Sequence, residues 1–232
     1  PFIVFSSDTR KLFLGSPYLY STVSLVDPLL TVTMPPPVTA ATGLDALSHA
    51  VEGAESSVNP YTESLASTCV ELLLAYLPRA FREGEDLEAR YHLSFASVMG
   101  MLAYAQGGGL YAHSLSYLLT THFDWPHGVG CGVALPYTLE YNADAIAPLL
   151  SRFAGAVRAA RAEEHGRKGE SRGEGDDDAR ITVEALFGLL EELNVPTDLK
   201  GLALGEEMID TFVEELVETY KRPKNPRALD KE

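Results

Sequence analysis

The sequence predicts a mainly α-helical protein with a short strand-rich segment at its amino end. From about residue 35 onward, apolar residues recur at the spacing of three and four that marks one face of a helix. The first residues, PFIVF, instead form an apolar run with aromatic and β-branched side chains, as in a strand. A composition that is 46% hydrophobic and 22% charged is that of a globular protein with a sizeable core.

The amino-terminal segment is expected to contain two strands. FIVF at residues 2–5 and TVSLVDP at residues 22–28 have strand character, with SPYLYS between them, which is consistent with a hairpin or the edge of a larger sheet. Because the chain starts at Pro1 with a strand that has no partner before it, we expect it to begin within a longer fold. We therefore predict a strand-rich remnant at residues 1–34 and a helical domain at residues 35–232.

Helical periodicity predicts a succession of helices after the strands. The first is entered through a proline run, with Thr39 or Thr42 as its candidate N-cap. The expected helices are residues 35–56, 59–81, 86–106, 107–123, 126–160 as one or two helices, 181–196 and 206–223. Residues 161–180 interrupt the pattern with many charged residues, several glycines and no large apolar side chain, so we predict a flexible surface loop there.

Charge and cysteine usage narrow the classes of partner. The formal net charge is -15, with 33 acidic and 18 basic residues, which disfavours nucleic acid and anionic membranes and favours small molecules. The two cysteines, Cys69 and Cys131, are not paired as in a zinc ribbon or a disulfide framework, which fits a reducing, cytoplasmic setting. No apolar run reaches the roughly 18 residues of a membrane span.

Four residues are candidate metal ligands. In TGLDALSHAVE, Asp45 and His49 are four residues apart and lie on one face of the expected helix. His113 lies within a later helix, and His127 follows Pro126, where a turn can aim its ring across a cleft. Imidazoles with one carboxylate suit iron(II) or zinc, so a four-point site in a helical core is one interpretation. Hydrogen-bonded core histidines are the alternative.

Other polar residues are assigned structural roles. His122 is also a possible ligand by residue type, but we expect it, like His92 and His165, to be a hydrogen-bonded structural histidine. We expect Asp124 and Glu52 to be surface carboxylates. Two glycine clusters, GGGL and GVGCG, lack the strand, G-x-G-x-x-G turn and helix of a dinucleotide fold. Their glycines are better explained as room for a cofactor or substrate to approach the backbone.

The segments TAATGLDALSHAVEG, NPYTESLA, GLYAHSLSYLL, PHGVGCGVALPY and NPRALDKE resemble the iron-dependent (group III) alcohol dehydrogenases in order and spacing. The resemblance implies a helical metal-binding domain related in fold to dehydroquinate synthase, preceded in the family by an α/β domain that binds NAD(P). It also implies that Asp45, His49, His113 and His127 bind Fe²⁺, with Zn²⁺ as a competing ion.

Three further residues take implied roles near the cofactor. Lys11 matches a family lysine beside the cofactor, and Leu30 lies in VDPLLT, which resembles a segment lining the adenosine side. Tyr117 stands where the family commonly has a second histidine near the nicotinamide and the substrate. A phenol, with a pKa of about 10, shuttles protons less readily than imidazole at neutral pH.

The implied function is oxidation of an alcohol to an aldehyde or ketone, with hydride transfer to NAD or NADP. The resemblance also implies that this chain is a fragment without the nucleotide-binding half, so we expect the isolated chain to be inactive. The expected partner is a small alcohol or aldehyde, and a homodimer is a possible assembly. The alternative function is a metal-binding helical module without redox activity, which hydrolyses a substrate or only binds.

Overall fold

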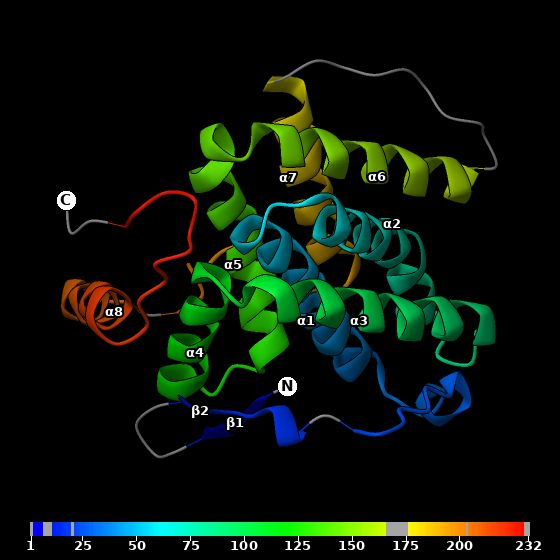
Figure 1. Cartoon of the computed structure of the whole chain (residues 1–232), viewed down its shortest axis with the longest axis horizontal. Helices are drawn as coiled ribbons and strands as arrows, with labels where there is room; N and C mark the ends of the chain where they lie inside the picture. Colours follow the sequence, from blue (N-terminus) through cyan, green and yellow to red (C-terminus); the bar gives the residue numbers. More distant parts are fainter. Residues whose placement is uncertain (1, 7–10, 20, 166–175, 203, 230–232) are drawn as a thin grey trace.

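Helix α1 (Pro36–Ser56) runs through the middle of the molecule, and α2, α3 and α5 pack against it (Figure 1). The computed structural model describes residues 2–6, 11–19, 21–165, 176–202 and 204–229. The other helices are α2 (Pro60–Arg82), α3 (Leu87–Gly107), α4 (Tyr111–Phe123), α5 (His127–Asn142), α6 (Ala147–His165), α7 (Asp176–Glu192) and α8 (Glu206–Glu218). The expected mainly α-helical fold is confirmed.

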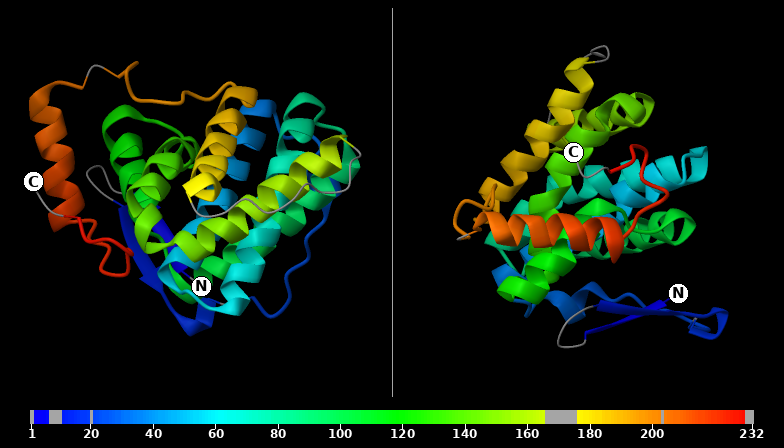
Figure 2. Two further views of the ribbon diagram at one scale, coloured as in Figure 1. Left: turned by 90° about the horizontal axis from the view of Figure 1, so that it is seen from above. Right: turned by 90° about the vertical axis from the view of Figure 1, so that its left-hand side faces the viewer.

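The strand segment is a hairpin at one edge of the helical body (Figure 2). Strands β1 (Phe2–Ser6) and β2 (Lys11–Gly15) are antiparallel, with Phe2 opposite Gly15. The predicted strand at residues 2–5 is confirmed, but the one predicted at residues 22–28 is wrong. That run has no strand and leads into the 3-10 turn η2 (Pro28–Thr31), because Pro28 has no N–H to donate to a sheet and the Asp27 side chain caps the turn.

Most predicted helices are confirmed, with changes at their ends. Neither Thr39 nor Thr42 caps α1, which begins one residue after Pro35 and has no side-chain cap. Proline fits the first turn because the N–H that it lacks has no partner there. The expected segment 126–160 divides into α5 and α6 around the short 3-10 helix η3 (Ala143–Ala145).

The charged loop predicted at residues 161–180 is wrong at both of its ends. Helix α6 continues to His165 and α7 begins at Asp176, so both ends of the 161–180 segment are helical. Residues 166–175 lie outside the described part of the chain, and the prediction of a flexible loop is untested there.

Glycines bring the backbones of α1 and α3 close together. A Cβ added at Gly53 of α1 would lie 2.5 Å from the backbone carbon of Ala103 on α3. In the reverse direction, a Cβ added at Gly100 of α3 would lie 2.6 Å from the carbonyl oxygen of Ala46 on α1. Both distances are far shorter than a normal contact between non-bonded atoms. Helices α1 and α3 can therefore cross this closely only because Gly53 and Gly100 have no side chain.

Buried apolar side chains fill the space around this crossing. The largest fully buried ones are Phe153, Leu44, Leu47, Leu73, Leu77, Leu110, Leu118, Leu119, Leu135, Leu139, Leu150 and Leu190. A smaller cluster joins α8 to α4 through Phe212, Leu216 and Tyr220, which pack with Tyr117 and Leu119. Within the described residues, no helix has the length and apolar character needed to cross a membrane.

A buried polar network fastens the carboxy-terminal segment to α1 and α5. Asn142 donates from Nδ2 to Glu55 Oε1 at 3.0 Å, and Asn225 donates from Nδ2 to Asn142 Oδ1 at 2.8 Å. Glu55 Oε2 has no hydrogen-bond partner among the described residues. Burial raises the pKa of Glu55 to about 8, so this carboxyl carries a proton at neutral pH.

We expect Gly100→Ala to destabilise the fold by about 1–3 kcal/mol or more, because its Cβ would meet the α1 backbone. Gly188→Ala on α7 is the matched control, since nothing lies within 4 Å of the added Cβ. Alanine should there raise the free energy of unfolding by about 0.5–1 kcal/mol through helix propensity. Urea denaturation followed by circular dichroism measures both, and equal effects of the two substitutions would contradict the close crossing.

We expect Glu55→Gln to remove part of the pH dependence of stability. The unfolded chain releases this proton near 4.5 and the folded chain near 8, so the stabilising contribution is complete below the first pKa and is lost as the pH rises through the second. Denaturation measured at about pH 5 and at about pH 8 should show that the free energy of unfolding falls more between these pH values in the natural chain than in the variant. Glu140→Gln, at an exposed position on α5, is the control that should leave the slope unchanged.

Candidate metal centre

Helix α1 presents three polar side chains on one face. Asp45, His49 and Glu52 are separated by four and three residues, which places them one above another along the helix. Solvent exposure of these side chains decreases along the helix. It is 30% for Asp45, 14% for His49 and zero for Glu52. The expectation that Glu52 is a surface carboxylate is therefore wrong.

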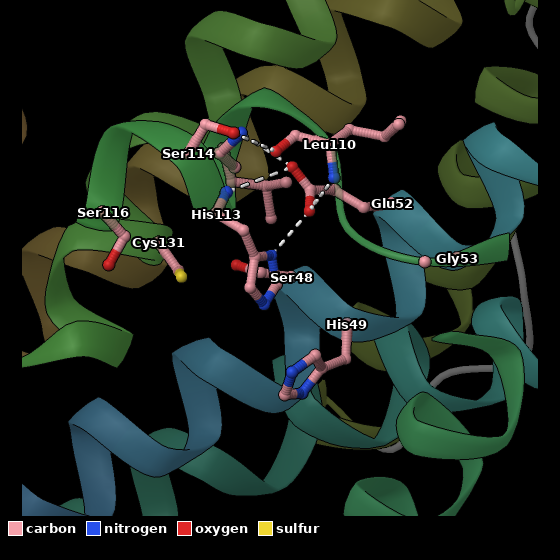
Figure 3. A network of polar contacts seen from close by, with 12 residues as sticks. Ser48, His49, Glu52, Gly53, Leu110, His113, Ser114, Ser116 and Cys131 are labelled. Carbon is pink, nitrogen blue, oxygen red and sulfur yellow. Dashed lines mark hydrogen bonds and ion pairs between the residues drawn. The ribbon is translucent and has the colours of Figure 1, made fainter. Parts of the chain in front are cut away.

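Glu52 is held by the first turn of α4. Its Oε2 accepts the Leu110 N–H at 2.7 Å and its Oε1 accepts the Ala112 N–H at 2.7 Å, so the carboxylate occupies the amino end of the helix (Figure 3). Its Oε2 also lies 2.5 Å from Nδ1 of His113. Burial alone would raise the pKa of Glu52, but its contact with His113 and the Leu110 N–H hold that pKa below its usual value.

This contact fixes the tautomer of His113. An ionised carboxylate is only an acceptor, so Nδ1 carries the proton that is donated to Glu52. In the neutral imidazole, which is the form that binds metals, the lone pair then lies on the other ring nitrogen, Nε2. Among the described residues this nitrogen has no hydrogen-bond partner, and the His113 side chain is only 1% exposed. A buried acceptor without a donor is costly unless something else binds it.

His127 is fixed in a similar way at the start of α5. Ser116 Oγ donates to the His127 carbonyl oxygen at 2.6 Å and lies 2.7 Å from His127 Nδ1. A hydroxyl has a single proton, so Ser116 must accept from Nδ1–H, which again leaves the lone pair on Nε2. Gly128 lets α5 approach α1 closely, because an added Cβ would collide with the carbonyl oxygen of Ala41. The glycine thus makes room for protein backbone.

The three imidazoles converge on one oxygen of Asp45. Its Oδ1 lies 3.8 Å from Nε2 of His49, 3.8 Å from Nε2 of His113 and 3.5 Å from Nε2 of His127. These distances exceed the N···O separation of about 2.7–3.2 Å in hydrogen bonds. They approach the separation of about 3.3–3.6 Å between donors that share a tetrahedral ion at about 2.0–2.2 Å. The donor set therefore fits a divalent metal ion.

His49 is kept in its neutral form by its surroundings. Its ring packs edge-on against Tyr104, with centroids 4.6 Å apart, and lies 4.8 Å from the ring of His113. Burial, followed by the proximity of His113, lowers the pKa of His49 to about 3. The imidazole is consequently unprotonated near neutral pH, which is the state that binds metals.

Of the other predicted site residues, Tyr117, Leu30 and Lys11, the structure places Tyr117 against a histidine of the cluster. Tyr117 is buried and stacks on the ring of His127, with centroids 5.3 Å apart and 9° between the planes. Burial raises the pKa of Tyr117 above its usual value. Leu30 lies in η2 and is 78% exposed, and no described contact joins it to the histidines. Lys11 begins β2, and its side chain lies outside the described residues.

Residues expected to be structural keep that role where the structure describes them. His92 stacks on Tyr76, with centroids 4.1 Å apart, and His122 Nε2 lies 3.1 Å from Glu215 Oε1. Asp124 is exposed and ends α4 in a left-handed conformation. The side chain of His165 lies outside the described residues.

Two participants were missed by sequence reasoning. Glu52 lies seven residues after Asp45 and three after His49. This helical spacing was the signal that could have placed Glu52 on the same face of α1 as Asp45 and His49. Cys131 lies four residues after His127, one turn along α5, and its Sγ is 3.6 Å from His127 Nε2. Asp45, His113, His127 and Cys131 each offer one donor atom, and these atoms lie within 4.8 Å of one another.

Known proteins with similar sequences and structures show the family of this chain. The Fe-containing alcohol dehydrogenase family, C-terminal, matches residues 39–232. Choline dehydrogenase of Bacillus subtilis (strain 168) is 31% identical over 217 residues, which cover 93% of this chain and 52% of that protein. The chain spans about half the length of the relatives that it matches.

Two solved structures share the fold. Sulfoacetaldehyde reductase from Bifidobacterium kashiwanohense, in complex with NAD+, has a TM-score of 0.81 and 31% identity, covering 95% of this chain and 54% of that one. An iron containing alcohol dehydrogenase has a TM-score of 0.78 and 25% identity, covering 99% of this chain and 55% of that one. The motif order, the fold and the family match lead to one conclusion: this chain belongs to the Fe-containing alcohol dehydrogenase family.

Proposed function

We propose that this chain binds one divalent metal ion through Asp45, His49, His113 and His127 and forms the metal-holding part of an NAD(P)-dependent alcohol dehydrogenase. The main support is the approach of three imidazole nitrogens to within 3.5–3.8 Å of Asp45 Oδ1. Fe²⁺ is the proposed ion, and Zn²⁺ is a competitor that the same donors accept.

When bound, the metal supplies Lewis acidity toward an alcohol oxygen, and NAD(P) supplies the hydride acceptor. The contribution of the chain is to hold its donors in the required state before binding. Glu52 keeps the proton of His113 on Nδ1, and Ser116 does the same for His127. Such partners orient a ligating imidazole and raise its basicity.

Tyr117 is proposed as a positioning residue. It stacks on His127 and, because burial raises its pKa, it keeps its proton at physiological pH. Its role in this proposal is to support the His127 ring and to donate a hydrogen bond, and proton shuttling is left to other groups.

Cofactor and partners are proposed at the level of chemical class. A matching structure contains NAD+, which supports NAD or NADP as the cofactor, with Lys11 and Leu30 kept as predicted contacts. Because this chain spans about half the length of its relatives, hydride transfer is assigned to a protein that also supplies a nicotinamide-binding part. A small alcohol or aldehyde as substrate, a homodimer and a cytoplasmic location stay predictions.

We expect one metal ion per chain, and a large loss of affinity in Asp45→Ala and His113→Ala, because each removes a donor atom. Glu52→Gln should weaken binding by about 10–100-fold, since it removes only the partner of a ligand. His122→Ala, which alters a surface histidine on the same helix as His113, is the control that should bind normally. Elemental analysis and zinc calorimetry of the chelator-treated chain measure this. Normal binding by Asp45→Ala and His113→Ala would refute the assigned site.

We expect the metal-loaded 232-residue chain to form no NAD(P)H from a panel of primary alcohols and choline. Fusion to the part of the Bifidobacterium kashiwanohense neighbour that this chain does not match should produce NAD+-dependent turnover. Asp45→Asn in the fusion should abolish that turnover. Turnover by the chain alone would contradict the need for a second part. A metal-binding fusion that never reduces NAD(P)+ would favour the alternative of a metal-binding module without redox activity.

A further inference from the structure

Cys131 lies beside the proposed metal ligands but is not among them. Its Sγ is 3.6 Å from His127 Nε2, and the thiol is completely buried. Figure 3 shows the sulfur reaching from α5 toward the region where the His113 ring lies. The donor atoms of Asp45 and His113 fall within the same 4.8 Å cluster as this sulfur. The 3.6 Å contact is within the range of a hydrogen bond to sulfur, and a shared ion would take the place of that hydrogen bond.

The distances fit a sulfur that shares an ion with nitrogen. Bonds of about 2.3 Å to sulfur and about 2.0–2.1 Å to nitrogen, at the angles of about 90–120° in a five-coordinate centre, place neighbouring ligand atoms about 3.1–3.8 Å apart. The Cys131 Sγ to His127 Nε2 distance is 3.6 Å, and the Asp45 Oδ1 to His127 Nε2 distance is 3.5 Å. His113 Nε2 provides the independent observation, because it is a buried acceptor without a hydrogen-bond partner in the same cluster.

We propose that Cys131 Sγ is an additional ligand of the ion held by Asp45 and the histidines, so that the centre contains sulfur. This inference rests on the proposed metal site. On binding, the sulfur–hydrogen bond is replaced by a sulfur–metal bond, and the proton passes to solvent buffer without any change in oxidation state. A thiolate beside the Asp45 carboxylate would balance the two positive charges of the ion.

Sulfur ligation changes which ions the centre prefers. Thiolate is a soft ligand that favours zinc, cobalt and cadmium, whereas manganese and magnesium favour oxygen. A site with one carboxylate and three imidazoles has no thiolate and lacks this preference for soft ions. The Cys131→Ser substitution should therefore weaken cobalt and zinc binding more than manganese binding.

Cobalt(II) titration of the chelator-treated 232-residue chain, without oxygen or added thiols, tests the assignment. The natural chain should show visible ligand-field bands together with a near-ultraviolet thiolate-to-cobalt charge-transfer band. Cys131→Ser and Cys131→Ala should lose the near-ultraviolet band and keep the visible bands. Cys69→Ala is the matched control, because Cys69 is the other cysteine of the chain and lies in the core beside Ala46. It should retain both sets of bands.

Each contrary outcome has a distinct meaning. Visible bands without a near-ultraviolet band in the natural chain would overturn the role of Cys131 and leave the metal site intact. A near-ultraviolet band that persists in Cys131→Ser and Cys131→Ala and disappears in Cys69→Ala would do the same. Failure of cobalt, zinc and iron(II) to bind the folded natural chain would overturn the metal site itself, and sulfur ligation with it. Circular dichroism of each variant confirms folding.

Discussion

The buried carboxylate of Glu52 connects the architecture to the chemistry. It satisfies the N–H groups at the start of α4 and fixes the proton of His113, although α1 and α4 are far apart in sequence. Without a negative charge there, the buried helix end would lose its acceptor and the imidazole its preferred tautomer. One interaction therefore aligns two helices and determines which nitrogen faces the metal centre. Ser116 fixes the proton of His127 on Nδ1 in the same way.

The proposed metal centre is built from three helices that contribute different donor atoms. Helix α1 contributes the carboxylate oxygen on which the imidazoles converge, α4 contributes a deeply buried nitrogen, and α5 contributes a half-exposed histidine and a buried thiol. Exposure increases from His113 to His127, so the centre has a dry side and an open side. Asp45 and His127 are the accessible residues of the open side, with 30% and 33% of their side chains exposed.

Much of this arrangement could be predicted from sequence, because helical periodicity is local and Asp45 and His49 occupy one turn. The orientation of Glu52 could not, since its burial depends on the distant N–H of Leu110. The second strand was misplaced because TVSLVDP has strand composition, whereas the hairpin forms between nearer segments. The position of Cys131 was missed for a related reason. Its spacing from His127 was visible, but the packing that brings its sulfur within 4.8 Å of the donor atoms of Asp45 and His113 is tertiary and was not.

The close crossings at Gly53, Gly100 and Gly128 have a consequence for how the protein tolerates change. Where backbones meet directly, the distance between helix axes is set by main-chain atoms and does not depend on the size of intervening side chains. The leucines around the crossings fill space without determining that distance. Substitutions among these leucines can therefore accumulate while the donor atoms keep their separation. A substitution at a crossing glycine would instead push the two backbones apart.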